Sequence, residues 1–187
     1  MRISDDRYDR DLRRYNLAWR MIQHEARTTT IVLWAGLSKY RIQTLFRAYQ
    51  KAGESTRHRG VSPFQPAYFS RSLTHECESS ALAYVALQMD IIPTEIVPDA
   101  PLSLPSLARG ERLLNAFELY RALIPNSKIS LEHAVLLMTE LAQRRILSLG
   151  HCQLCDGLMV VDRLGVRHTR CAFCRLAGQT SGRLSND

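Results

Sequence analysis

The local fold of the C-terminal region is decided by residues 151–175, HCQLCDGLMVVDRLGVRHTRCAFCR. Two CxxC pairs in this stretch, separated by fifteen residues, consist of Cys152, Cys155, Cys171 and Cys174. Each CxxC turn places two thiolates at adjacent corners of a tetrahedron, and the spacing is typical of a structural zinc site. Four protein ligands leave no open position for water or substrate, so we expect one zinc ion that stabilises the fold without catalysing a reaction.

The residues between the two cysteine pairs predict a hairpin. Leu158–Val161 has the composition of a strand, Arg163–Gly165 that of a turn, and Val166–Arg170 that of a returning strand. Such a hairpin would bring the two CxxC turns together. We therefore expect a small four-Cys zinc ribbon with a basic tail over residues 146–187.

Other uses of these cysteines are alternatives. Four reduced thiols or two disulfides fit the same residues, and His151 and His168 flank the pattern as possible replacement ligands. Four suitably spaced thiols favour treating both histidines as bystanders. A thioredoxin-like redox site is disfavoured, because there are two CxxC pairs and neither lies in a βαβ pattern.

Length and composition indicate a globular protein. The chain has 187 residues, 45% of them hydrophobic, which is enough for one ordinary domain and a small appendage. Residues 1–7 are charged where a signal peptide needs an apolar run, and no apolar stretch approaches the roughly 20 residues of a membrane span. We expect a cytoplasmic protein without a membrane partner, whose reduced thiols are available to a metal.

Charge is distributed unevenly along the chain, whose net charge is +7. Residues 1–60 hold 13 basic and 6 acidic groups, residues 61–143 hold 5 and 9, and residues 144–187 hold 7 and 3. Of the 25 basic residues 22 are arginines, which bind phosphates and guanine edges bidentately. Two basic ends favour a polyanion partner, with nucleic acid first; a solvated basic surface or a genomic bias toward arginine is the alternative.

The first helix predicted by the sequence carries a heptad seam. Apolar or aromatic residues alternate in steps of four and three at Tyr8, Leu12, Tyr15, Trp19, Ile22 and Ala26. The seam is too short for an autonomous coiled coil. We expect it to pack on other helices, either of this chain or of a partner.

Two further segments have the spacing of a helix-turn-helix. Thr28–Ala35 and Ser38–Gln50 are predicted as helices, with Gly36 allowing the sharp turn and Ser38 capping the second helix. The residues expected to pack the pair together are Ile31, Ala35, Leu37, Ile42 and Leu45. Any two helices joined by a glycine turn can show this pattern, so it is only moderately specific.

The exposed face of the second helix offers donors suited to a major groove and its phosphates. These candidate DNA contacts are Lys39, Tyr40, Arg41, Gln43, Thr44 and Arg47. Further backbone contacts are expected from the ribbon arginines Arg163, Arg167, Arg170 and Arg175.

The rest of the chain completes a mainly α fold. A helix starting at Pro66 is expected to run to Leu87, with Cys77 as a buried core thiol on its apolar stripe. Prolines predict an extended crossover over 90–110. Two more helices are predicted at 111–124 and 131–145, the second capped by Ser130. We therefore expect a helical domain over residues 1–145, which contains the helix-turn-helix-like pair at about 28–50.

The chain resembles the FlhC family, the zinc-containing subunits of bacterial flagellar master transcription activators. The resemblance is carried by Leu37, Ser38, Arg41, Ile42, Leu45, Phe46, Pro63, Phe64 and Phe69, and by the cysteine quartet with Leu147 and Leu149 just upstream. It implies a complex of two FlhC with four FlhD subunits that binds upstream of flagellar operons and recruits RNA polymerase. It also implies that the four cysteines are the metal ligands.

These observations favour a DNA-binding subunit of a transcriptional activator over an enzyme. The alternative is a zinc-stabilised interaction scaffold whose partner alone makes the DNA contacts. A zinc enzyme is disfavoured, because His75-Glu76-Cys77 lacks the deaminase arrangement and Glu132-His133 is not HExxH. No small-molecule substrate is expected.

Overall fold

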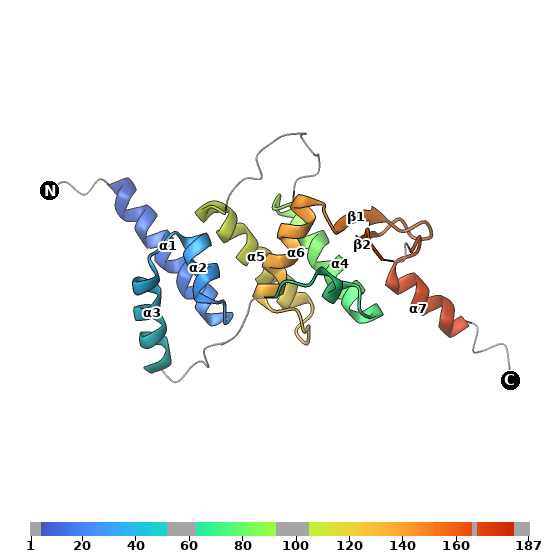
Figure 1. Cartoon of the computed structure of the whole chain (residues 1–187), viewed down its shortest axis with the longest axis horizontal. Coiled ribbons are helices and arrows are strands. Elements are labelled where there is room, and N and C mark those ends of the chain that lie inside the picture. Colours follow the sequence, from blue (N-terminus) through green and yellow to red (C-terminus); the bar gives the residue numbers. More distant parts are fainter. Residues whose placement is uncertain (1–4, 52–62, 93–104, 166–167, 182–187) are drawn as a thin grey trace.

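Helices dominate the computed structural model of the chain, which describes residues 5–51, 63–92, 105–165 and 168–181 (Figure 1). The mainly α fold class is thereby confirmed. In chain order the described elements are α1 (Asp5–Gln23), α2 (Thr28–Ala35), α3 (Lys39–Lys51), the 3-10 helix η1 (Pro66–Phe69), α4 (Leu73–Gln88), α5 (Leu107–Leu123), α6 (Leu131–Gln143), β1 (Leu147–His151), β2 (Leu158–Asp162) and α7 (Ala172–Ser181).

Helix α1 packs against α2 and α5, and part of the predicted seam takes part in this packing. Its buried residues are Leu17, Ala18, Met21 and Ile22. Of the predicted seam, Ile22 and Ala26 are buried, and Tyr15 and Trp19 pack partly buried against the same core. Tyr8 is 66% exposed and Leu12 is exposed as well, so the first part of the seam does not pack on the described helices. Among the described residues, the helices that α1 packs on lie along its C-terminal half, whereas its N-terminal end projects away from them (Figure 1).

The turn between α2 and α3 has the predicted geometry. Gly36 ends α2 in the left-handed region, with φ 66°, and its N–H donates to the carbonyl of Val32 at 3.1 Å. Glycine adopts this conformation without the strain that a Cβ imposes. Ser38 Oγ accepts the N–H of Arg41 at 3.4 Å and caps α3. The predicted packing residues Ile31, Ala35, Leu37 and Ile42 are buried, and Leu45 packs partly buried against them.

The predicted continuous helix from Pro66 was wrong. Pro66–Phe69 forms a single 3-10 turn, and α4 begins only at Leu73. Ser72 is extended and its Oγ accepts the N–H of His75 at 3.4 Å, which is an N-cap that starts a new helix. The apolar stripe assigned to this helix does not form the core, since Cys77 is only half-buried and Tyr84 is exposed.

Helix α5 starts earlier than predicted and passes close to α1 and α2. Ser106 caps it through the N–H of Arg109, so residues 107–110 are helical where an extended crossover was expected. Most of that crossover, 93–104, lies outside the described residues. A Cβ added at Gly110 would lie 2.7 Å from Leu17 Cδ2, so glycine permits the close approach of α5 to α1. Helix α6 begins after the predicted cap, Ser130.

The C-terminal hairpin forms between different strands from those predicted. β1 pairs antiparallel with β2 in a register that joins Leu147 to Asp162 and His151 to Leu158. The predicted returning strand was wrong, because residues 168–170 are not extended into a strand; residues 166 and 167 lie outside the described part. Leu147 is buried in the same core as the helices, and Val160 N–H donates to Ser80 Oγ of α4 at 3.0 Å. The sheet therefore docks on α4 and α6.

Candidate metal centre and helix-pair surface

The four predicted cysteines come together at one end of the molecule. Their Sγ atoms all lie within 4.8 Å of one another, and those of Cys155 and Cys171 are 3.7 Å apart. Zn–S bonds of about 2.3 Å in a tetrahedron place neighbouring sulfurs about 3.8 Å apart. The four thiols are thus positioned to bind one metal ion.

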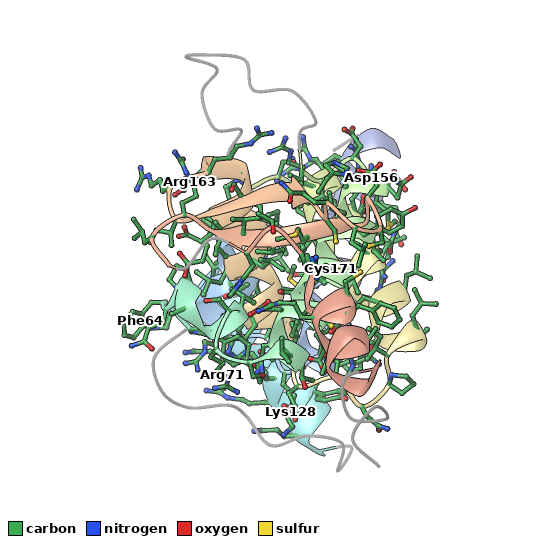
Figure 2. All side chains as sticks on the ribbon, turned by 90° about the vertical axis from the view of Figure 1, so that its right-hand side faces the viewer. Phe64, Arg71, Lys128, Asp156, Arg163 and Cys171 are labelled. Carbon is green, nitrogen blue, oxygen red and sulfur yellow. The ribbon has the colours of Figure 1, made fainter. Side chains whose placement is uncertain are left out.

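Local backbone geometry positions each cysteine. Cys152 follows β1, and Cys155 lies in the tight turn that leads to β2, where Cys152 N–H donates to the Gly157 carbonyl at 3.0 Å. Cys171 immediately precedes α7 and Cys174 lies in its first turn. The two CxxC segments are joined by a hydrogen bond from Gln153 N–H to the Thr169 carbonyl at 2.9 Å. Figure 2 looks at this end, with Cys171 near the centre.

Backbone N–H groups point at the sulfurs. The N–H groups of Cys171 and Leu154 donate to Cys152 Sγ at 3.3 and 3.4 Å, and that of Cys174 donates to Cys171 Sγ at 3.4 Å. Hydrogen bonds from the N–H groups of Cys171 and Cys155 lower the pKa of Cys152 to about 6, because they stabilise its thiolate.

At neutral pH one thiol of the cluster resists ionisation. Hydrogen bonds with the sulfurs of Cys155 and Cys171 raise the pKa of Cys174 to about 12, because a further negative charge is unfavourable there. A set that contains one stabilised thiolate and one thiol that resists ionisation fits a bound cation, whose positive charge would favour the thiolate form of all four. His151 and His168 are exposed, and the group of potential ligands contains the four thiols alone among the described residues.

The arginines predicted to contact DNA from this region have different surroundings. Arg175 forms an ion pair with Glu76 that connects α7 to α4, so its guanidinium is bound within the chain. Arg163 donates from Nη1 to the carbonyl of Arg144 at 2.6 Å, at the end of α6. Arg170 is exposed, and Arg167 lies outside the described residues. Arg175 and Arg163 therefore brace the metal region against the helices.

The predicted donors of α3 lie on its outer surface. Lys39, Tyr40, Arg41, Thr44 and Arg47 are exposed and Gln43 is half-buried. The hydroxyl of Thr44 donates to the carbonyl of Tyr40 at 3.1 Å. Figure 1 shows α3 and α7 at opposite ends of the long axis, so the structure does not bring these donors together with the ribbon arginines.

Helix α6 holds the helix pair in place through a carboxylate that sequence reasoning missed. The residue before α2, Arg27, provides no side-chain cap. Instead Glu132 accepts the N–H of Arg27 at 2.8 Å and the hydroxyl of Thr30 at 3.0 Å. Glu132 is only 9% exposed, so both donors are satisfied away from water. This contact positions α2, and through it α3, on the central helices.

A second unpredicted cluster surrounds Tyr68. The ring of His133 stacks on Tyr68 with centroids 4.0 Å apart, and the guanidinium carbon of Arg71 lies 4.4 Å from the Tyr68 centroid. Arg71 Nε donates to Nε2 of His75 at 3.0 Å. Burial lowers the pKa of both histidines, and Arg71 lowers them further. A sequence signal was available, since both helices begin with Ser-x-x-His, at 72–75 and 130–133.

Comparisons with known proteins leave the family open. Neither models of protein families nor curated proteins match this chain. Among the described residues, no helix combines the length and the apolar character that crossing a membrane requires.

Proposed function

We propose that this chain is a DNA-binding subunit of a transcriptional activator and that α3 is its reading helix. The observation that carries the proposal is the exposed donor face of α3 on a helix pair that is packed on its other side by Ile31, Ala35 and Ile42. Arg41 and Gln43 are suited to base edges, and Lys39 and Arg47 to phosphates.

The proposal extends to the FlhC family on the strength of the resemblance. In that case the chain assembles with FlhD, two FlhC with four FlhD, and binds promoter DNA of flagellar operons to activate transcription by RNA polymerase. The residues that carry the resemblance in α3, the cysteine quartet and the basic termini support it. The proposed function needs no catalytic activity and places the protein in the cytoplasm, where its thiols stay reduced.

We further propose that the ion in the four-Cys site is zinc with a structural role. Four thiolates in a tetrahedron suit zinc or an iron–sulfur centre. Cys152 and Cys174 are buried and the sulfurs lie close enough for a single ion, which favours mononuclear zinc. The ion would hold the turn after β1 and the start of α7 together.

DNA binding of the complex with co-expressed FlhD tests the proposal. We expect Arg41→Glu combined with Arg47→Glu to weaken binding to DNA from upstream of a flagellar operon by roughly ten-fold or more. The slope of log affinity against log salt should fall by about 1, because Arg47 is proposed to contact a phosphate, whereas Arg41 is proposed to contact a base edge.

A matched double variant controls for net charge. Lys128→Glu with Arg145→Glu makes the same change in charge at exposed positions outside α3. We expect this control to keep most of the affinity. Equal losses in both double variants, or no loss in either, would overturn the assignment of α3 as the reading helix.

A second candidate function is an interaction scaffold in which FlhD alone contacts DNA. The exposure of Tyr8 and Leu12 favours it, because α1 continues its apolar stripe beyond the helices of this chain and offers it to a partner helix. Photo-crosslinking of a modified promoter to the complex separates the two functions. Crosslinks from α3 to DNA support the first, and crosslinks confined to FlhD support the second.

A further inference from the structure

An apolar groove lies between α4, α5, β2 and α7. Its volume is about 600 Å³ and its lining includes Cys77, Ala81, Tyr84, Leu123, Leu158 and Phe173. The lining comes from segments of the chain up to a hundred residues apart in sequence. The groove therefore exists only in the folded protein.

Large apolar side chains stand exposed around this groove. Phe173 is 70% exposed, Leu123 66% and Tyr84 55%. Leu119 and Leu176, on the same helices as Leu123 and Phe173, are exposed as well. Large apolar side chains left exposed at a groove are typical of an interaction site.

The groove carries almost no charge. Among its described lining residues the single charged side chain is Glu78, and Ser127 already donates a hydrogen bond to it at 2.8 Å. Two copies of this surface would therefore meet without placing unpaired like charges opposite each other.

We propose that the groove is a self-association surface whose occupant is a second copy of this chain. The same patch holds both a largely exposed ring, Phe173, and a groove of about 600 Å³ that could receive such a ring. In a two-fold symmetric contact the Phe173 ring of each copy enters the groove of the other.

The area fits such a pair. Five exposed apolar side chains supply on the order of 500 Å² per copy, hence about 1,000 Å² in all, the lower limit for a specific interface. The pairing also leaves α3 free, because α3 lies at the far end of the molecule from α7 (Figure 1).

Sedimentation velocity on the full chain, loaded with metal and free of DNA, tests the proposal at roughly 1 to 100 µM. We expect a monomer–dimer equilibrium for the wild type and at least a ten-fold higher dissociation constant for Phe173→Asp. Leu123→Asp, on α5 and away from the metal ligands, should act in the same way. Leu164→Asp is the matched control, because Leu164 is 79% exposed outside the groove, and should leave the equilibrium unchanged.

Metal content and circular dichroism confirm that each variant is folded. The proposal is overturned if the wild type stays monomeric at all concentrations. It is also overturned if Leu123→Asp associates as strongly as the wild type. If the wild type does not self-associate but the groove variants lose binding to FlhD, the groove is the binding site for FlhD. That result also overturns the proposal. The measurement contains no DNA, so its outcome is separate from that of the proposed function.

Discussion

Arg71 donates from its guanidinium Nε to Nε2 of His75, and this bond requires a neutral imidazole. The other ring nitrogen, Nδ1, lies 2.8 Å from the hydroxyl of Ser72, the cap of α4. Protonation of His75 would place a second positive charge beside Arg71. The stability of the N-terminal end of α4 therefore depends on the protonation state of His75, and hence on pH.

We predict that the protein loses stability as the pH falls below the ordinary histidine pKa of about 6.5. The folded-state pKa values of His75 and His133 are lowered, so protons bind more tightly to the unfolded chain. The stabilising contribution is complete above pH of about 6.5 and is lost as the pH falls through the lowered values. The charges of Arg71 and Lys128 oppose protonation of His75, whereas that of Glu78 favours it. For His133, Arg71 and His75 oppose protonation, whereas Glu132 favours it.

Urea unfolding at about pH 7.5 and 5.5 measures the effect. We expect the wild type to lose more free energy of unfolding between these values than His75→Gln or His133→Gln, since glutamine is neutral at both. The window lies above the lowered pKa values of Glu111 and Glu118, which titrate in more acidic solution. An identical pH dependence in all three proteins would contradict the prediction.

We predict that Cys→Ser at any of the four metal ligands unfolds the C-terminal region while α1–α3 remain folded. Structural zinc supplies on the order of 10 kcal/mol of folding free energy in small domains, and in the proposed zinc site both CxxC segments would bind the same ion. Limited proteolysis with metal analysis checks this. Cys155→Ser should be cleaved near β2 and α7 and should have lost its metal.

The chain supplies a control for that substitution. Cys77→Ser changes a half-buried thiol outside the ligand set, so it should keep the metal and resist the protease. Full resistance of Cys155→Ser after removal of metal would show that packing alone holds the C-terminal region.

We predict that Glu132→Ala destabilises the protein by about 2–4 kcal/mol, because it removes the acceptor of two hydrogen bonds at the start of α2, one buried and one part-buried. Glu132→Gln retains one acceptor oxygen and should lose clearly less. Denaturant unfolding measures the free energies, and hydrogen exchange shows where protection is lost. We expect the loss in α2 and α3; equal stability of the alanine variant and the wild type would show that water replaces the carboxylate.

The turn between α2 and α3 was predictable because its determinants are local. Gly36, Ser38 and the buried Ile31 and Ile42 act within a few residues of one another, and each acts through backbone conformation or helical spacing. The cysteine pattern is local in the same sense, since each CxxC turn sets the separation of two sulfurs. Both features needed no knowledge of distant segments.

The strand pairing was not predictable by the same reasoning. Leu158–Val161 was correctly assigned as a strand, but its partner was sought downstream instead of upstream. Both flanking segments can be extended, and the choice depends on burial of Leu147 in the helical core and on the hydrogen bond from Val160 to Ser80. Neither contact leaves a periodic signal in the sequence.

Residue type and short spacing were enough to predict the four-cysteine cluster, the helix pair with its glycine turn, and the mainly helical class. Long-range packing set which part of the α1 seam is buried, which strand pairs with β2, and how Glu132 and Tyr68 connect distant helices. The partners in the last two contacts are 102 and 65 positions apart, as in Thr30 with Glu132 and Tyr68 with His133. Contacts at such separations form only when the whole core packs.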